Sequence, residues 1–347
     1  MNYSIVVPVY NRPDEVDELL ESLCSQTLKD FEVVIVEDGS QKPCKDVCDK
    51  YANILNLHYY YKDNSGPGQS RNYGVEHANG DYVIILDSDV VLPEGYMMAI
   101  NSQLSTYNFQ PVCWGGPDAA HPSFTPIQKA ISYSMTSFFT TGGIRGGKKK
   151  LDKFYPRSFN MGIRKDVYLQ LGGFSKMRFG EDIDFSYRMV EAGYQPQLFP
   201  DAWVWHKRRT DFRKFFRQVY NSGIARINLE KRHPGTMKLV HLLPMVFTVG
   251  VIALILISAV GRALMHYVDR DQFYWMCFAP WLPLLLYSLV ILIDSTIQNK
   301  SLKVGLLSVP AAFVQLMGYG FGFIEAWWKR CVQRKDEFQA FEKTFYQ

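Results

Sequence analysis

Two aspartates that follow an apolar run are the first residues in this sequence whose types and spacing indicate chemistry. Asp87 and Asp89 form an Asp-x-Asp pair directly after Val-Ile-Ile-Leu. In an extended chain, side chains two positions apart point to the same side, so both carboxylates can face one ligand. Mg²⁺ is usually held by one or two carboxylates together with substrate phosphates. The pair therefore predicts a site for a divalent cation and a nucleotide, although a solvated turn also accommodates such a pair.

Polar residues stand at similar places elsewhere in the chain. Asp38 ends the apolar run that begins at Phe31, and Asn11 follows Ser-Ile-Val-Val-Pro-Val-Tyr. Arg71 follows a glycine-rich turn, where it either neutralises phosphate or is an ordinary surface charge of a helix. His206 follows Trp-Val-Trp and is either a further metal ligand or a packed residue, since imidazole serves in both ways.

A second acidic motif begins a predicted amphipathic helix. Glu181 and Asp182 come directly after Gly180, which provides the turn. Carboxylates at a helix N-terminus are favoured by the helix dipole, whatever their function. One of them can also act as a general base, which must reach the attacking hydroxyl to within about 3 Å. Both interpretations of this motif stay open at the level of sequence.

The elements that position these residues alternate between strand-like and helix-like patterns. Apolar runs typical of buried strands are separated by amphipathic stretches, and the runs cover residues 4–10, 31–40, 57–61 and 81–90. This alternation predicts an α/β fold with a mainly parallel sheet and helices on both faces. In such sheets the ligand site lies beyond the carboxyl ends of the strands. The polar residues expected at that edge are Asn11, Asp38, Arg71, Asp87 and Asp89.

Composition and motifs exclude several other classes of protein. Hydrophobic residues make up 47% of the 347 residues and charged residues 21%, which argues against disorder and against a coiled coil. The sequence contains no phosphate-binding G-x-x-x-x-G-K-[ST] motif and no G-x-S-x-G nucleophile elbow. The six cysteines have neither zinc-site nor disulfide-framework spacing, so we expect structural thiols.

The C-terminal third has the composition of a membrane region. Three windows lack Asp, Glu, Lys and Arg: residues 239–261, 272–293 and 304–324. Each is longer than the roughly 20 residues that cross the hydrocarbon core, and aromatic residues stand near their ends. Pro310 and several glycines make the third window the weakest candidate for a full span.

The basic charge of the chain is concentrated just before this region. Residues 202–236 hold nine Lys and Arg against two acidic residues, and the chain as a whole has a net charge of +4. Such a neck suits an anionic membrane surface better than a nucleic-acid groove, and the positive-inside rule places it in the cytosol. With no signal peptide visible, we expect a multi-pass protein of the inner membrane with its polar domain in the cytosol. Three full spans conflict with this rule, because they would put the basic tail outside.

Five ordered stretches together resemble the family 2 glycosyltransferases of the GT-A fold. They read SIVVPVYN, EDGS, GPGQSRNYGVEHANGDYVIILDSD, NMGIRKDVYLQLGGF and GEDIDFSYRMVEAGY. The match covers roughly residues 3–210. It implies an inverting transfer of a sugar from a nucleotide-sugar donor, helped by Mg²⁺ or Mn²⁺, with a UDP-sugar favoured.

The resemblance also implies roles for individual residues. Those expected to hold the nucleoside are Pro8, Tyr10, Asn11 and Asp38. Asp87 is expected to contact the ribose or the sugar, and Asp89 the metal, with His206 as a possible further ligand. Asp182 is expected to be the base, with Glu181 beside it. The organisation that follows is a GT-A domain over residues 1–210, a basic amphipathic neck over 211–238, a membrane region over 239–328 and a basic tail over 329–347.

One departure from the family pattern narrows the expected function. Processive polysaccharide synthases of this family have a Q-x-x-R-W motif after the base, and residues 215–226 lack it. The pattern that stands there is similar to succinoglycan-type exopolysaccharide transferases, which implies one-sugar extension of a lipid-linked saccharide. Two alternatives stay open: transfer to a polyprenyl phosphate, as in dolichyl-phosphate mannose synthases, and a membrane scaffold that binds nucleotide sugars without turnover.

Overall fold

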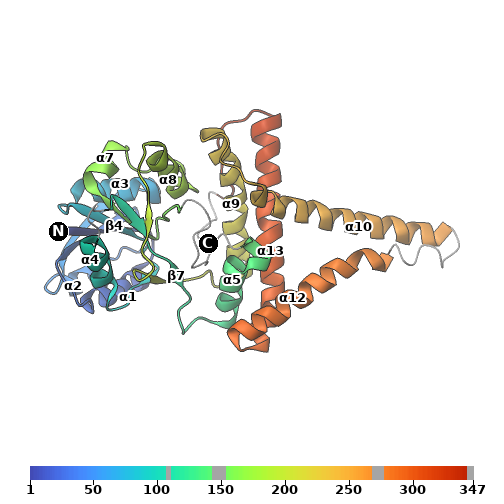
Figure 1. Ribbon diagram of the computed structural model, residues 1–347, viewed down its shortest axis with the longest axis horizontal. Helices are drawn as coiled ribbons and strands as arrows, with labels where there is room; N and C mark the ends of the chain where they lie inside the picture. Colours follow the sequence, from blue (N-terminus) through green and yellow to red (C-terminus); the bar gives the residue numbers. More distant parts are fainter. Residues whose placement is uncertain (107–110, 143–153, 268–276, 342–347) are drawn as a thin grey trace. The chain divides into compact units, whose positions relative to one another are not determined.

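The chain divides into two compact units (Figure 1). A computed structural model describes residues 1–106, 111–142, 154–267 and 277–341. Unit 1 consists of Met1–Pro122 and Gly146–Lys207, and unit 2 of Ser123–Arg145 and Arg208–Gln347. The predicted domain of residues 1–210 therefore includes a stretch, 123–145, that groups with the C-terminal unit.

Unit 1 is built on a seven-stranded sheet with the order β3-β2-β1-β4-β8-β6-β9. The strands are β1 (Tyr3–Val9), β2 (Phe31–Asp38), β3 (Asn56–Lys62), β4 (Tyr82–Leu86), β6 (Cys113–Gly115), β8 (Asn160–Arg164) and β9 (Gln197–Leu198). The first four pair in parallel, β8 is antiparallel to both of its neighbours, and β6 is parallel to β9. The mainly parallel α/β sheet predicted from the sequence is confirmed.

Helices cover both faces of this sheet, which is why its strands read as continuous apolar runs. One layer contains α1 (Pro13–Cys24), α2 (Lys45–Tyr51) and α4 (Tyr96–Thr106), and the other contains α3 (Pro67–His77), α7 (Lys165–Gln170) and α8 (Glu181–Glu191). Along β1, Ile5 and Val7 pack into the first layer and Val6 into the second. The residues at the carboxyl ends of β1, β2 and β4 therefore emerge at one edge of a rigid core.

A small second sheet extends that edge. It consists of β5 (Val90–Val91), β10 (Val204–His206) and β7 (Asp118–Ala119), in the order β5-β10-β7. In the antiparallel pairing of β10 with β5, His206 stands opposite Val90, the residue after Asp89. This pairing joins parts of the chain that are more than a hundred positions apart.

Unit 2 is helical within its described residues. Its helices are α5 (Pro126–Thr136), α6 (Phe138–Thr141), α9 (Phe212–Arg232), α10 (Leu243–Tyr267), α12 (Leu282–Asn299) and α13 (Leu302–Trp327), with short 3₁₀ turns at Leu239–His241 and Ala279–Trp281 and a π-helical end at Trp328–Val332. Three stretches are long and apolar enough to cross a membrane: Leu239–Tyr267, Ala279–Asn299 and Leu302–Val332. They overlap the three windows expected from the sequence, and residues 272–276 of the second window lie outside the described residues.

The third window forms one continuous helix that passes through Pro310. Its glycines let neighbouring backbones approach closely. A Cβ added to Gly322 would lie 2.0 Å from the carbonyl oxygen of Tyr220 in α9, and one added to Gly223 of α9 would lie 2.1 Å from the carbonyl oxygen of Tyr319. Of the glycines that made this window look weak as a membrane span, Gly318 and Gly322 are thus contacts with α9, and Gly320 is a contact with α10.

We expect that replacing Gly223 by Ala lowers the thermal stability of the full chain in detergent. The added methyl group collides with backbone, and overpacking of this kind costs about 1–3 kcal/mol. The matched control is Gly250→Ala in α10, where an added Cβ meets nothing within 4 Å. Scanning fluorimetry of both variants checks the prediction, and equal midpoints for Gly223→Ala and the wild type would contradict it.

Candidate active site

Two aspartates and a histidine form a cluster at the carboxyl edge of the sheet in unit 1. Asp87 and Asp89 lie in the turn between β4 and β5, and His206 ends β10. One ligand atom from each of the three lies within 4.8 Å of the others. His206 Nε2 is 3.2 Å from Asp89 Oδ1. The resemblance implied Asp89 as a metal ligand and His206 as a possible further one, and the structure places Asp87, which was expected to contact the ribose or the sugar, in the same cluster.

The donor atoms of this cluster fit a divalent cation. Carboxylate oxygens suit Mg²⁺ and Mn²⁺, and imidazole nitrogen suits several transition metals. All three side chains are partly buried, so their geometry is held while an opening to solvent remains. Asp118 of β7 lies 3.8 Å from the other ring nitrogen of His206, Nδ1. This separation is longer than a hydrogen bond, so Asp118 adds negative charge beside the imidazole.

Arg12 and Glu15 flank the same aspartate. A guanidinium nitrogen of Arg12 lies 3.0 Å from Asp89 Oδ2 and 2.6 Å from Glu15 Oε2. Burial raises the pKa of Glu15, and the Arg12 guanidinium opposes that rise. The start of α1 therefore contributes one positive charge next to Asp89.

A buried arginine connects this cluster to the second acidic motif. Arg71 in α3 donates to Asp87 Oδ1 at 2.7 Å and to Glu181 Oε1 at 2.9 Å. Its side chain is only 5% exposed, and the ring of Phe174 packs 5.4 Å from the guanidinium carbon. The sequence left Arg71 open between a phosphate ligand and a surface charge. The structure commits it to two carboxylates, so it is not a surface charge.

Glu181 and Asp182 are adjacent but have different partners. Burial raises the pKa of Glu181, the Arg71 guanidinium opposes that rise and the Asp182 carboxylate adds to it. Asp182 Oδ2 lies 2.9 Å from Nε of Arg157, and its Oδ1 accepts from the backbone N–H of Ile183. Glu181 is thus held by a buried cation, whereas the arginine beside Asp182 is 38% exposed.

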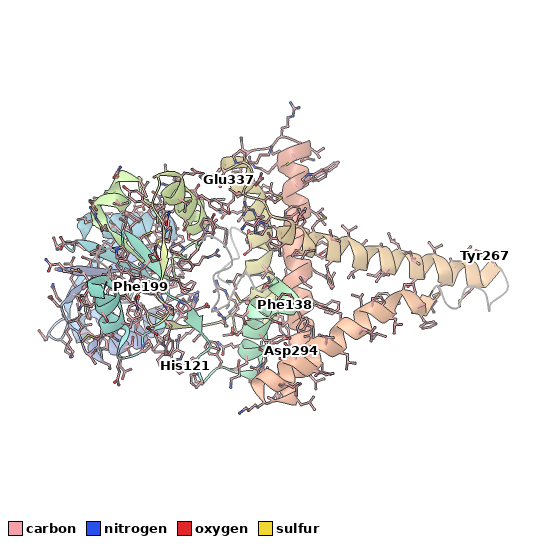
Figure 2. All side chains as sticks on the ribbon, viewed as in Figure 1. His121, Phe138, Phe199, Tyr267, Asp294 and Glu337 are labelled. Atoms are coloured by element: carbon pink, nitrogen blue, oxygen red, sulfur yellow. The ribbon has the colours of Figure 1, made fainter. Side chains whose placement is uncertain are left out.

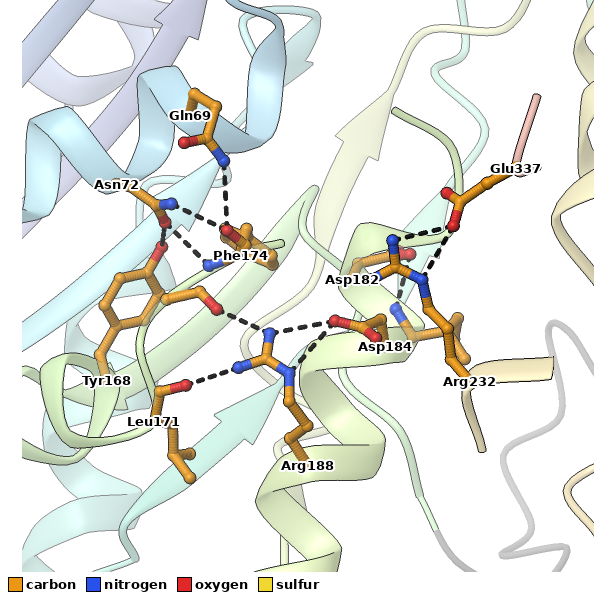
Figure 3. A network of polar contacts seen from close by, with 12 residues as sticks. Gln69, Asn72, Tyr168, Leu171, Phe174, Asp182, Asp184, Arg188, Arg232 and Glu337 are labelled. Atoms are coloured by element: carbon orange, nitrogen blue, oxygen red, sulfur yellow. Dashed lines mark hydrogen bonds and ion pairs between the residues drawn. The ribbon is translucent and has the colours of Figure 1, made fainter. Parts of the chain in front are cut away.

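A polar network fixes the loop before α8 to the neighbouring helices (Figure 3). The Asn72 side chain of α3 donates to the carbonyl of Phe174 and accepts from its N–H and from the Tyr168 hydroxyl. Arg188 of α8 donates to the carbonyls of Leu171 and Gly173 and pairs with Asp184. These contacts hold α3 and α8 at the separation that Arg71 requires to reach Glu181.

The residues expected to hold a nucleoside lie together at the ends of β1 and β2. Pro8 is in β1, and Tyr10 and Asn11 follow it. Asn11 has a φ of 56°, in the left-handed region that asparagine tolerates better than most residues. Its side-chain oxygen accepts from the N–H groups of Gln41 and Lys42 after β2. Asn11 therefore joins the loops that follow β1 and β2.

Asp38 holds the loop that follows β3 in a similar way. Its Oδ1 pairs with Nζ of Lys62 at 2.5 Å and accepts from the N–H of Ser65. Its Oδ2 accepts from the N–H of Gly66. The predicted nucleoside ligands are therefore brought together, and two of them also hold the strand-end loops in place.

The amino-acid sequence of residues 4–171 matches the family model described as Glycosyl transferase family 2. Residues 4–171 of this chain are therefore similar to a family 2 glycosyltransferase domain. A mannosyltransferase, PcManGT from Pyrobaculum calidifontis, solved in complex with GDP-Man and Mn²⁺, is similar with a TM-score of 0.57 at 12% identity, over 94% of this chain and 87% of that one. At that identity the likeness shows the fold alone, and the fold is GT-A.

Curated relatives match parts of the chain. The Pre-mycofactocin glycosyltransferase of Mycobacterium tuberculosis is 25% identical over 282 residues, which is 75% of this chain and 53% of that protein. An uncharacterized glycosyltransferase of Rickettsia felis is 38% identical over 86 residues, 25% of this chain and 14% of that protein. The chain thus spans about half or less of the length of these relatives.

Three contacts of the glycosyltransferase domain escaped the sequence analysis: Asp118 beside His206, Arg157 beside Asp182, and Arg12 beside Asp89. Each joins elements that are far apart in the chain, and the pairing of β7 with β10 creates the first of them. Arg12 follows the predicted ligand Asn11 directly, which is the only sequence signal that any of the three offers.

We expect that Arg71→Met destabilises the glycosyltransferase domain strongly. Removing one member of a buried ion pair leaves uncompensated charge, which typically costs about 3–5 kcal/mol. The control is Arg164→Met, whose ion pair with Asp166 is exposed and is expected to be worth at most about 1 kcal/mol. Thermal unfolding of the purified full chain compares the two. Equal midpoints for both variants would show that Arg71 is not the structural centre of the site.

Proposed function

We propose that the protein is an inverting glycosyltransferase that moves one sugar from a nucleotide-sugar donor to an acceptor hydroxyl. The observation that carries the proposal is the cluster of Asp87, Asp89 and His206 in a family 2 domain, tied by Arg71 to a second pair of carboxylates. The donor lies across the carboxyl ends of β1, β2 and β4, with its nucleoside near Pro8, Tyr10 and Asn11.

Asp89 and His206 hold the metal, and Asp87 faces the same space while it is paired with Arg71. A bound Mg²⁺ or Mn²⁺ would neutralise the negative charge that develops on the departing nucleotide diphosphate. Asp118, 3.8 Å from Nδ1 of His206, adds negative charge beside the imidazole. Asp38 contributes to donor binding through the loop of residues 62–66 that it holds.

Asp182 is the base in this proposal. It takes the proton of the acceptor hydroxyl as that oxygen attacks the anomeric carbon from the face opposite the nucleotide, so one displacement inverts the configuration. Arg157 orients the carboxylate of Asp182. Glu181 is a positioning residue, because its carboxylate is committed to Arg71. Neighbours at a helix start point about 100° apart, so only one of the two acids faces the anomeric carbon.

The acceptor that we propose is a lipid-linked saccharide at the cytosolic face of the inner membrane, in succinoglycan-type exopolysaccharide synthesis, with a UDP-sugar as donor. The three apolar stretches of unit 2 support a membrane-bound acceptor.

The test is a panel of nucleotide sugars given to the purified full chain in detergent, read by released nucleotide. Acceptor arms with a lipid-linked saccharide and with a polyprenyl phosphate then decide between extension of a glycan and charging of the lipid carrier. A protein that binds donors but releases no nucleotide with any acceptor would be a scaffold.

Metal dependence is tested by Asp89→Asn. The amide retains the shape but is a poor metal ligand, so most of the transfer activity should be lost while the protein stays folded. Chelation by EDTA should do the same to the wild type, and Mn²⁺ or Mg²⁺ should restore it. The control is Asp166→Asn, an exposed carboxylate of α7. Full turnover of the wild type in excess EDTA would exclude the metal.

The base is tested by Asp182→Asn. Positioned proton transfer is worth ~10²–10⁴-fold, so the rate of transfer should fall by about that factor. Donor binding should change little, because the donor contacts come from β1, β2 and β4. Glu181→Gln should cost less, since it still accepts from Arg71. The opposite ranking of the two variants, with both folded, would make Glu181 the base.

A further inference from the structure

The C-terminal tail returns to the helix that precedes the apolar stretches. The Asn221 side chain of α9 accepts from the N–H of Ala340 at 2.9 Å and donates to its carbonyl at 3.1 Å. Asn221 is 1% exposed. Asn228 donates to the carbonyl of Phe338, and Arg232 pairs with Glu337 at 2.8 Å. The tail therefore lies along α9, and both must be on the same side of any membrane.

This contact restricts the number of membrane crossings. Residues 239–332 lie between α9 and the part of the tail that contacts it, and they contain all three candidate spans. Two segments on one side of a bilayer are separated by an even number of crossings. With three apolar helices, at least one of them does not cross.

Helix α13 is more buried against other helices than α10 or α12. Within its apolar window 44% of the residues are buried inside the protein, against 11% for each of the other two stretches. It packs along α9 through Gly318, Gly322 and the partner glycine Gly223. The Tyr220 hydroxyl of α9 also donates to Glu325 of α13 at 2.5 Å.

The charge of α9 fixes the depth at which α13 lies. Helix α9 holds six Lys and Arg among its 21 residues, and each such charge at the bilayer centre is expensive. Figure 1 shows α13 beside α9 and α5 over much of its length. A helix packed along α9 therefore stays near the aqueous interface. The apolar surface that it retains suits the boundary between headgroups and acyl chains.

Helices α10 and α12 have the opposite character. Both expose rows of large apolar side chains: Val246, Val249, Ile252, Ile255, Leu256 and Val260 on α10, and Leu282, Leu285, Leu286, Leu289 and Ile293 on α12. A hydrogen bond joins them: Nε1 of Trp281, the residue just before α12, donates to the hydroxyl of Ser258 in α10 at 2.8 Å. Figure 2 shows Tyr267 at the far end of this pair and Asp294 at its base.

Polar contacts mark the base of this pair of helices. The Tyr133 hydroxyl of α5 donates to Asp294 at 2.6 Å. Close contacts at Gly305 and Gly320 of α13 hold α12 and α10, since added Cβ atoms would lie 2.0 Å from Thr296 Oγ1 and 2.1 Å from Thr248 Oγ1. The start of α10 and the end of α12 therefore both contact α13.

We propose that α10 and α12 cross the bilayer as a helical hairpin, and that α13 lies in the membrane interface together with α9. The partner of the apolar hairpin surface is the hydrocarbon of a lipid bilayer. This arrangement keeps the tail, with Lys329, Arg330, Arg334 and Lys335, on the same side as the basic neck, as the positive-inside rule requires. It also resolves the conflict that three full spans create, and it does not depend on the enzymatic activity.

The test is the side of the membrane from which cysteines react with a membrane-impermeant maleimide. Cys331, just after α13, is exposed in the native chain and serves as the tail probe. Lys231→Cys near the end of α9 and Tyr267→Cys at the tip of the hairpin provide the other two probes. Labelled peptides from intact cells and from inverted vesicles are identified by mass spectrometry, so no native cysteine has to be removed.

We expect Cys331 and Lys231→Cys to react only in inverted vesicles and Tyr267→Cys only in intact cells. Reaction of Cys331 from the same side as Tyr267→Cys would mean that α13 crosses, and would overturn the proposal. Reaction of all three probes from one side would mean that the hairpin does not cross, and would overturn it equally. Because Cys331 is native, the side from which the tail reacts is read in the unaltered chain.

Discussion

The ion pairs of Arg71 are the interaction on which the candidate site depends. A guanidinium buried to this degree is tolerated only when its charge is compensated, and Asp87 and Glu181 provide that compensation from two different elements. The same pairs fix the distance between the turn after β4 and the start of α8. Asp87 of the candidate metal cluster and Glu181, the neighbour of the proposed base Asp182, are therefore joined by one buried charge.

The pairing of the strands brings the residues of the candidate site to one edge of the sheet. Parallel strands bring their carboxyl ends to one edge, where Asn11 and Asp38 use their side chains to hold the loops that follow. The small second sheet then adds His206 to the same edge by pairing β10 with β5. The site is built on strand ends and a helix start rather than on long loops, which gives the precise positioning that catalytic groups need.

Unit 2 depends on a different constraint, the close approach of helices. Glycines of α13 face α9, α10 and α12, so that one helix is the common contact of the others. Small residues at such contacts allow van der Waals packing that larger side chains prevent. As a consequence, the three apolar helices differ in how much of their surface is buried. Within its apolar window α13 is 44% buried, against 11% for each of the other two stretches, which expose their apolar side chains.

The sequence by itself determined the features that are local. Continuous apolar runs indicated buried parallel strands, the Asp-x-Asp spacing placed two carboxylates on one turn, and uncharged windows indicated three long apolar helices. Only the tertiary structure decided the partners: Arg71 between Asp87 and Glu181, Arg157 beside Asp182, and the tail along α9. The reason is physical. Periodicity and composition record whether a side chain is buried and how the local backbone runs, whereas an ion pair or a helix contact depends on which distant surfaces meet. For the same reason Gly318 and Gly322 looked like weaknesses in a membrane span, although they are the places where α9 packs.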